Sequence, residues 1–366
     1  MKKVAGVFSP RLNKNHIVFY EALSHLFHHK GVEVVFFIDK WFEDKVKLSG
    51  KDKFIYNTFR HEFLFYIKQF YKLRKCDYVI IEPDSSKILL ASFVILFRLD
   101  FTLVVHNANY WLNPTEISGL REYVIIYLNN ILFNRAKSLI VVNSNVKKFC
   151  LDHTSKKVYY FPFNLYLTIG DKLINQNTDS IINLVVPGNV SSNRRDYITI
   201  LEGFEYALKS RRDLRLVLLG KVDINDRFLL EKIQGLKIKF PLNILFWNDF
   251  IDDKEFEFYI ETSTLFIAPL NQYIKTDISI EEYGITKETG VTSFIRKNNK
   301  YCLAPNYLVF EEDLHHLIIK YRDSFDFAGL LCDLIYDDVS KVQSKTDDTY
   351  MSFVENEVDM YLKENY

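Results

Sequence analysis

The stretch Tyr283-Gly284-Ile285-Thr286-Lys287-Glu288-Thr289-Gly290 lies between two apolar segments and decides how the chain around it folds. The apolar run at 265–270 before it predicts a buried strand. After it, Val291, Phe294 and Ile295 have the spacing of one helix face. The stretch is therefore predicted to be a loop that leads from a strand into a helix.

This loop has the residue types that bind a diphosphate. Its glycines let a ligand approach the backbone, its threonines offer hydroxyls, and the helix start offers unpaired N–H groups. An exposed helix N-terminus stabilises an anion by only about 0.3–1 kcal/mol. Lys287, Thr286 and Thr289 would have to supply the remainder. The alternative is an ordinary helix start, with Thr286 as the N-cap and Lys287 solvated.

Strand and helix patterns alternate along the whole chain, which predicts an α/β fold with parallel, doubly wound sheets. In the first half the predicted strands are 3–8, 32–39, 54–57, 78–82, 102–106, 138–143 and 158–161, and the predicted helices are 17–29, 61–73, 87–97 and 116–134. In the second half the strands are 182–186, 214–219, 244–247, 265–268 and 301–303, and the helices are 196–209, 226–233, 254–261, the segment after Gly290, 310–321 and 324–335.

Two Rossmann-like domains in tandem are expected from this alternation. The first would span residues 1–164 and the second residues 181–345, joined by a polar linker without periodicity at 165–180. An amphipathic helix within residues 346–366 would follow and could pack back on the first domain.

Composition limits the class of protein. A chain of 366 residues with 48% hydrophobic and 26% charged residues is long enough for two globular domains. Its four cysteines show no C-x-x-C spacing, which indicates reduced thiols in a cytoplasmic protein without a disulfide framework or structural zinc. No run reaches the roughly 18 uncharged apolar residues that a membrane-spanning helix needs.

The zero net charge hides two oppositely charged halves. Residues 1–164 carry 24 Lys and Arg against 14 Asp and Glu, a net charge of +10, and the remainder carries −10. A basic half rich in aromatic residues would suit the anionic inner face of the cell membrane, and the alternative is a solvated surface. No nucleic-acid partner is expected, because the basic residues are dispersed and no recognition motif accompanies them.

Polar residues follow three predicted strands of the second half, where an open α/β sheet binds its ligands. Gly188 and Asn189 lead to Arg194 and Arg195, which could bind phosphate oxygens or simply precede a helix cap. The strand predicted at 214–219 is followed by Lys221, a further cation, and the strand predicted at 244–247 is followed by Asn248, which could bind a nucleobase edge.

These features resemble the donor-binding domain of GT-B glycosyltransferases, close to the family 4-like enzymes of bacterial polysaccharide synthesis. The resemblance rests on three motifs in order: 187–189 with 194–197, the run 265–270, and 283–290. It implies a GT-B fold, with two Rossmann-like domains facing each other across a cleft. It also implies a nucleotide-diphosphate sugar held mainly by Gly188, Asn189, Arg194, Arg195, Lys221, Asn248, Tyr283, Gly284, Thr286, Lys287, Thr289 and Gly290.

The resemblance also suggests catalytic residues. Many retaining members place two glutamates around an aromatic-Gly pair; here Glu281 occupies the first position, while Thr289 stands at the second and Glu288 lies one place early. If the enzyme inverts, His106 and His16 are candidate bases, because each follows a strand or lies in the loop after it. If it retains, no protein base is needed.

We therefore expect a glycosyltransferase that acts on a lipid-linked or saccharide acceptor in surface-glycan assembly, such as O-antigen or capsule. No metal or other cofactor is expected, because GT-B enzymes generally work without one and no Asp-x-Asp occurs in the sequence. The alternatives are a sugar-nucleotide epimerase of the same fold and an inactive scaffold that only binds sugar nucleotides.

Overall fold

The computed structural model describes residues 3–9, 16–39, 53–57, 67, 69, 72–83, 87–162, 181–334 and 348–365. The chain forms two compact units: residues 1–165, 275–288 and 347–366, and residues 166–274 and 289–346. The predicted linker and most of the predicted helix at 61–73 lie outside the described residues, as do residues 10–15 and 335–347. The domain boundaries proposed from the sequence stay predictions, because each borders on such residues.

The first unit is built on a seven-stranded parallel sheet in the order β3-β2-β1-β4-β5-β6-β7. Its strands are β1 (Val4–Ser9), β2 (Glu33–Asp39), β3 (Lys53–Asn57), β4 (Tyr78–Ile81), β5 (Thr102–Val105), β6 (Ser138–Val141) and β7 (Lys157–Tyr160). Its helices are α1 (Ile17–His29), α3 (Lys87–Phe97), α4 (Ala108–Leu112), α5 (Leu120–Arg135), α6 (Ser144–His153) and α13 (Asp348–Glu364).

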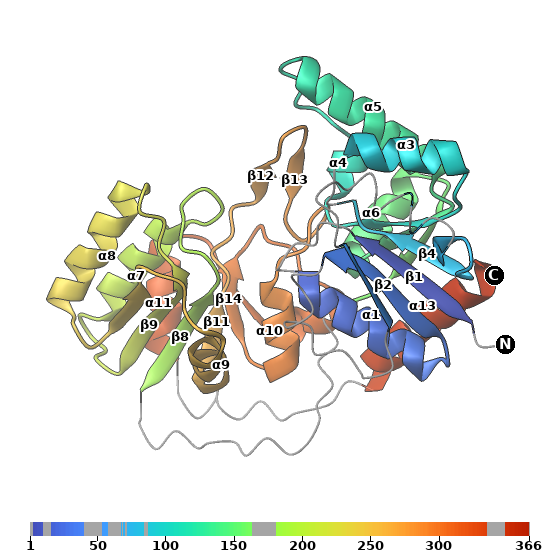
Figure 1. Ribbon diagram of the computed structural model, residues 1–366. Helices are drawn as coiled ribbons and strands as arrows, with labels where there is room; N and C mark the ends of the chain where they lie inside the picture. Colours follow the sequence, from blue (N-terminus) through green and yellow to red (C-terminus); the bar gives the residue numbers. More distant parts are fainter. Residues whose placement is uncertain are drawn as a thin grey trace. The chain divides into compact units, whose positions relative to one another are not determined.

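Both faces of this sheet are covered, because successive strand residues point to opposite sides. On one face, α1 and α13 bury their apolar residues against the strands; α13 contributes Val354, Val358 and Tyr361. On the other face α3, α5 and α6 form a second core around Leu103 and Val141. Figure 1 shows α3 and α5 side by side on this second face.

The second unit has a six-stranded parallel sheet in the order β10-β9-β8-β11-β14-β15. Its strands are β8 (Ile182–Pro187), β9 (Leu214–Lys221), β10 (Ile244–Trp247), β11 (Leu265–Ile267), β14 (Cys302–Pro305) and β15 (Ile318–Tyr321). Its helices are α7 (Tyr197–Ala207), α8 (Arg227–Lys239), α9 (Asp253–Thr262), α10 (Val291–Asn298) and α11 (Ser324–Asp333). The short strands β12 (Tyr273–Lys275) and β13 (Ile280–Glu282) form a separate two-stranded sheet where the chain returns to the first unit.

One predicted helix is wrong. Residues 310–321 have apolar residues at helical spacing, but they form a short 3-10 helix, η3 (Glu312–Leu317), followed by β15. The edge of the sheet decides the outcome, because Ile318 to Tyr321 pair in parallel with β14 from Cys302 to Pro305. Tertiary pairing thus overrides the local pattern.

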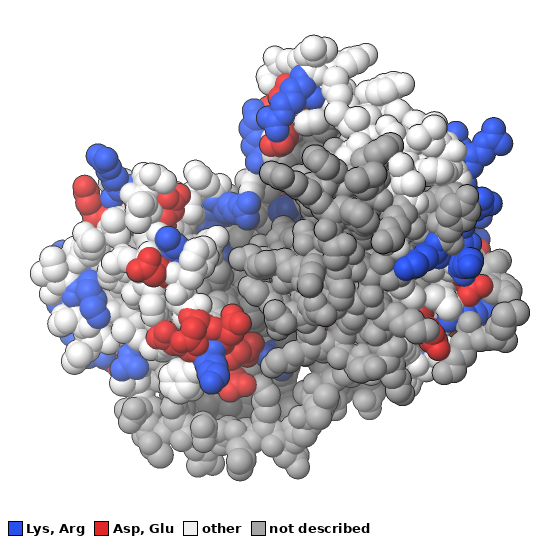
Figure 2. Space-filling view, in the orientation of Figure 1, with Lys and Arg blue, Asp and Glu red and all other residues white. Residues whose placement is uncertain are grey.

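The charge asymmetry of the sequence has a visible counterpart in the second unit. Figure 2 shows acidic side chains gathered over α9. Asp252 caps this helix through its side chain, and Asp253 and Glu255 lie in its first turn, where negative charge is favourable. No helix among the described residues is long and apolar enough to cross a membrane.

Candidate functional site

A cluster of two histidines and one glutamate lies where the first sheet reverses its strand order. The order changes direction between β1 and β4, and ligands of open α/β sheets bind outside the carboxyl ends of the strands at such a point. His16 precedes α1 in the connection after β1, Glu82 directly follows β4, and His106 directly follows β5. The topology therefore brings together three side chains from distant parts of the sequence.

One carboxylate oxygen joins the two imidazoles. Glu82 Oε1 contacts His16 Nδ1 and lies 2.6 Å from His106 Nε2, and the ring centres are 4.3 Å apart. Burial by itself would raise the pKa of Glu82, but the hydrogen bonds from His106 and His16 outweigh it and lower this pKa to about 2. An ionised carboxylate can only accept, so both contacting nitrogens carry protons. In each neutral ring the opposite nitrogen, His16 Nε2 or His106 Nδ1, then carries the lone pair.

The same three residues have the ligand types of a metal site, and their ligand atoms lie within 4.8 Å of one another. Their spacing fits a hydrogen-bonded network better. Two ligands on one zinc ion would be about 3.3 Å apart at ordinary bond lengths, whereas His106 Nε2 and Glu82 Oε1 are separated by 2.6 Å. Among the described residues, the buried second oxygen of Glu82, Oε2, has no hydrogen-bond partner.

The segment 275–288 is attached to the helix that follows His106. Glu281 is fully buried and accepts hydrogen bonds from the backbone N–H groups of Asn109 (3.2 Å) and Tyr110 (2.7 Å), in the first turn of α4. It also accepts from the Ser279 hydroxyl at 2.7 Å. Both carboxylate oxygens of Glu281 are thus engaged in holding α4.

The loop at 283–290 belongs to the first unit as far as Glu288. Gly284 adopts a φ of +81°, and its N–H donates to the carbonyl of Lys287 at 2.8 Å, closing a tight turn. The Lys287 ammonium donates to the Asn107 side chain, and the Thr286 hydroxyl accepts from the Glu282 N–H at 2.8 Å. The N-cap alternative for Thr286 is wrong, because the N-cap of α10 is Gly290.

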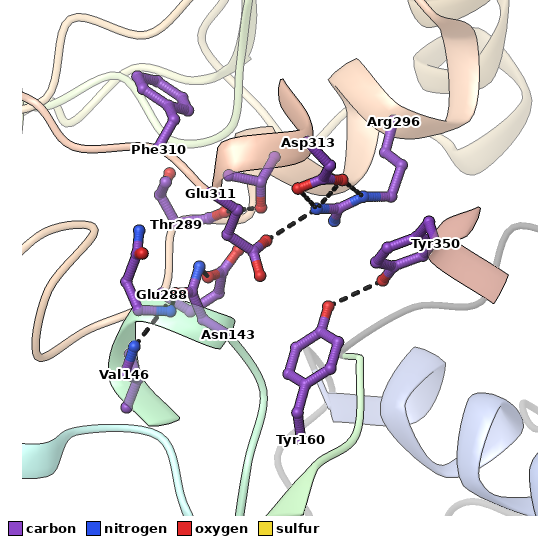
Figure 3. A network of polar contacts seen from close by, with 12 residues as sticks. Asn143, Val146, Tyr160, Glu288, Thr289, Arg296, Phe310, Glu311, Asp313 and Tyr350 are labelled. Atoms are coloured by element: carbon purple, nitrogen blue, oxygen red, sulfur yellow. Dashed lines mark hydrogen bonds and ion pairs between the residues drawn. The ribbon is translucent and has the colours of Figure 1, made fainter. Parts of the chain in front are cut away.

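Glu288 is the last residue of the segment 275–288, and it contacts Asn143, which also caps a helix. Asn143 donates to Glu288 through its side-chain nitrogen, and its oxygen caps α6 by accepting from the N–H groups of Asn145 and Val146. Figure 3 shows Asn143 between Glu288 and Val146. Glu288 thus contacts a side chain at the carboxyl end of β6, next to the strand that carries His106.

In the second unit, Gly188 and Arg195 shape the loop after β8, and Gly220 at the end of β9 packs against it. Gly188 has a φ of +97°, and a Cβ on it would lie 2.7 Å from Arg195 Nη2. Arg195 donates to the Pro187 carbonyl at 2.6 Å and to the Tyr197 hydroxyl at 3.1 Å. A Cβ on Gly220 would lie 2.2 Å from the Gly188 carbonyl oxygen, so only glycine fits at the end of β9.

The other predicted donor residues of this unit lie at several strand ends. Lys221 ends β9, and its ammonium is 5.1 Å from the centre of the exposed Phe250 ring. Asn248 is exposed just after β10, and the carbonyl of Arg194 accepts from the Asn271 N–H at 3.0 Å. Asn189 accepts from the Tyr197 hydroxyl at 3.3 Å through its carbonyl.

Thr289 and Gly290 stand at the start of α10. Thr289 is buried, and its carbonyl accepts from the Thr292 hydroxyl at 2.8 Å. The predicted donor residues therefore fall into two groups: Tyr283, Gly284, Thr286 and Lys287 belong to the first unit, and the remainder belong to the second.

The sequence patterns do not single out Glu82 or a charged cluster on α10. Glu82 is the last residue of the strand predicted at 78–82, and an acid at the carboxyl end of a strand is the signal that could have identified it.

Arg296 donates to Glu311 at 2.8 Å and to both oxygens of Asp313 (Figure 3). Burial raises the pKa of Asp313, against the lowering effect of Arg296.

Solved structures match the fold of almost the whole chain. The structure of Anabaena Alr3699/HepE in complex with UDP covers 99% of this chain and 100% of its own, with a TM-score of 0.62 and 12% identity. The lipopolysaccharide outer core galactosyltransferase WaaB matches 98% of this chain and 99% of its own, with a TM-score of 0.54 and 11% identity. The fold is GT-B.

The GT-B fold also occurs in a different class of enzyme. The structure of a putative UDP-N-acetylglucosamine 2-epimerase from Listeria monocytogenes covers 99% of this chain and 95% of its own, with a TM-score of 0.59 and 11% identity. No protein-family model and no curated protein sequence matches the chain. At these identities the likeness shows the GT-B fold alone.

Proposed function

We propose that the protein is a glycosyltransferase. It moves a sugar from a nucleotide-diphosphate sugar to a hydroxyl of a lipid-linked or saccharide acceptor in surface-glycan assembly. The observation that supports this most directly is the His16–Glu82–His106 cluster at the strand-order reversal of a GT-B first unit. The likeness to HepE in complex with UDP and to a lipopolysaccharide outer core galactosyltransferase supports the substrate class.

The cluster suits a transfer with inversion. The acceptor hydroxyl oxygen attacks the anomeric carbon while the bond from that carbon to the diphosphate oxygen breaks, and the nucleotide diphosphate leaves with the electron pair. His16 or His106 takes the hydroxyl proton on the ring nitrogen opposite Glu82. Glu82 does not touch the substrate in this scheme; it fixes the tautomers and stabilises the imidazolium that forms.

The leaving diphosphate needs positive charge and N–H donors. We assign this role to Thr286, Lys287, Thr289 and the N–H of Gly290, so that the reaction proceeds without a metal. Arg195 acts differently from the sequence expectation: it holds the Pro187–Gly188 turn through hydrogen bonds and thereby shapes the loop after β8. Glu281 and Glu288 are structural in this proposal, since they bond to α4 and to Asn143.

Epimerisation of a sugar nucleotide is the second candidate, and the likeness to the Listeria epimerase favours it. The two reactions differ in their need for an acceptor. An epimerase converts the sugar nucleotide when it is alone in solution, whereas a transferase leaves it intact until a hydroxyl acceptor is added.

Donor binding is measured first, by thermal unfolding of the full chain with UDP, GDP, dTDP, CMP and their sugar conjugates. A ligand at a hundred times its Kd adds about 2.7 kcal/mol of stability. We expect one nucleotide diphosphate to raise the unfolding temperature of the wild type and of Lys239→Ala, whose exposed lysine lies on α8, but not of Lys287→Ala. No shift with any nucleotide would contradict the proposal.

The reaction is then followed with the nucleotide sugar that binds. We expect no change of the sugar without acceptor, and release of nucleotide diphosphate with an oligosaccharide or lipid-linked acceptor. Glu82→Gln should keep the thermal shift and lose transfer by about a hundredfold, the usual range for an impaired general base. A new sugar nucleotide formed without acceptor would establish the epimerase instead.

A further inference from the structure

We propose that α3 and α5 of the first unit form a membrane-docking surface that inserts into one leaflet of a lipid bilayer. The residues of this α3–α5 surface are Ile88, Ile95 and Leu96 on α3 and Leu120, Tyr123, Val124 and Tyr127 on α5. The proposal goes beyond sugar transfer, because it concerns where the protein binds and not what it catalyses.

Helix α3 is apolar on every side although it lies on the surface. Its inner face buries Leu90, Phe93 and Val94 in the core, while Ile88 and Leu96 on the outer side are 58% and 69% exposed. Lys87 is the one charged residue among the eleven residues of α3. Its ammonium lies 3.9 Å from the centre of the Tyr110 ring. A helix that is apolar all round is normally covered on all sides, in a core or in a membrane.

Helix α5 continues this apolar surface with a stripe of large residues. Leu120, Tyr123, Val124 and Tyr127 follow the i, i+3, i+4, i+7 spacing, so they share one face of the helix. Leu120 is 81% exposed and Tyr123 is 64% exposed, whereas Leu132 of the same helix lies in the core. Because α3 and α5 pack side by side, their exposed residues lie on neighbouring helices (Figure 1).

The composition of this surface favours lipid as the occupant. Tyrosine is suited to the membrane interface, because its ring is apolar and its hydroxyl stays wet. The two helices with Arg98, which follows α3, carry four basic side chains and one acidic one, and Arg98, Arg121 and Arg135 are exposed. Arg98 and Arg135 can contact lipid phosphates, and Arg121 lies 3.5 Å from the Asp277 carboxylate. If two copies of the chain formed a two-fold dimer through this surface, the arginines of one copy would face the same arginines of the other.

A bond inside the first unit connects this surface with the proposed acceptor side. The buried Asn129 on the inner face of α5 donates to the carbonyl of Tyr110 in α4, at 3.2 Å. α4 begins two residues after His106 and is capped by Glu281. Docking through α5 would therefore bring a lipid-linked acceptor toward the cluster, a consequence that rests on the proposed function.

Vesicle flotation of the full chain, without nucleotide or acceptor, tests the surface. The vesicles consist of phosphatidylcholine alone or with phosphatidylglycerol. We expect the wild type to float with both, since apolar insertion supplies most of the binding, and more strongly with the anionic lipid. Leu120→Glu combined with Tyr127→Glu should weaken partitioning at least about tenfold, because two exposed apolar side chains no longer enter the lipid.

The matched control places the same chemical change on the second unit. Phe228→Glu combined with Ile238→Glu removes two comparably exposed apolar side chains from α8 and should change partitioning less than about twofold. Absence of wild-type flotation, or equal loss in both double variants, would overturn the proposal. So would a wild-type dimer in light scattering that only the α5 variant dissociates, because the surface would then bind a second copy. Since no step requires nucleotide, failure here leaves the transferase proposal standing.

Discussion

At the residue scale, Glu82 is a carboxylate whose environment differs strongly from water. It is 1% exposed, and it is held in its ionised form by two imidazole N–H groups. Those hydrogen bonds contribute to folding only while the carboxylate is ionised. The protonation state of one buried side chain is thereby coupled to the stability of three strand connections.

This coupling predicts a pH dependence of stability. Burial opposes ionisation, but the bonds from His106 and His16 lower the pKa of Glu82 from 4.5 to about 2. The contribution is present above pH 4.5 and is lost as the pH falls toward 2; its size is on the order of 3 kcal/mol. Urea unfolding at pH 5.5 and pH 3 should show a smaller loss for Glu82→Gln than for the wild type. Equal losses would show that Glu82 does not carry the acid sensitivity.

The sequence allowed part of this site to be predicted. His16 and His106 could be proposed because each follows a predicted strand or lies in the loop after it, where ligands bind in α/β folds. Glu82 could not be ranked in the same way, because its significance depends on two residues that are 66 and 24 positions away. Only the strand order, β1 beside β4 beside β5, brings them together.

At the scale of the element, close helix contacts depend on single glycines. α7 packs against α11, and a Cβ on Gly203 would lie 2.5 Å from the Ser324 carbonyl oxygen and 2.8 Å from the Phe327 ring. On α8, a Cβ on Gly235 would meet no atom within 4 Å. Both glycines lie inside helices of the second unit.

The same substitution at these two positions should have opposite effects. Gly203→Ala is expected to lower the free energy of unfolding by about 1–3 kcal/mol, because α7 and α11 must move apart. Gly235→Ala should raise it by up to about 1 kcal/mol, since alanine is the better helix former and nothing obstructs it. Chemical denaturation of both variants measures the difference. A stabilised Gly203→Ala protein would mean that the helices can separate without cost.

Elements with strong periodicity could be predicted, and those that depend on partners could not. The predicted strands at 3–8, 102–106 and 138–143 correspond to β1, β5 and β6. β15 was missed because its four residues continue a helical pattern and become a strand only beside β14. α6 was missed as well, although Asn143 is an N-cap residue of the preferred type.

At the scale of the whole molecule, the first unit depends on the end of the chain. Val354, Val358 and Tyr361 of α13 are fully buried in the core that α1 shares with the sheet, and the Tyr361 hydroxyl lies 3.2 Å from that of Thr102. The sheet face next to α1 is therefore incomplete until α13 has been synthesised.

A chain that ends at residue 346 should lose the cooperative unfolding of its first unit. Its exposed apolar sheet face would also promote aggregation. The control is Tyr361→Phe in the full chain, which keeps the packing, loses one hydrogen bond and should cost about 1 kcal/mol. Calorimetry distinguishes the two, and a shortened protein that melts within a few degrees of the wild type would contradict the expectation.

The return of residues 275–288 to the first unit has a consequence for recombination between relatives. A gene exchange with a single crossover near residue 165 would join one parent's α4 to the other parent's Glu281, the residue that accepts from Asn109 and Tyr110. Viable hybrids should therefore inherit this short insert from the same parent as the N-terminal unit. The three chain segments 1–165, 275–288 and 347–366, and not one continuous half of the sequence, would therefore have to be inherited together.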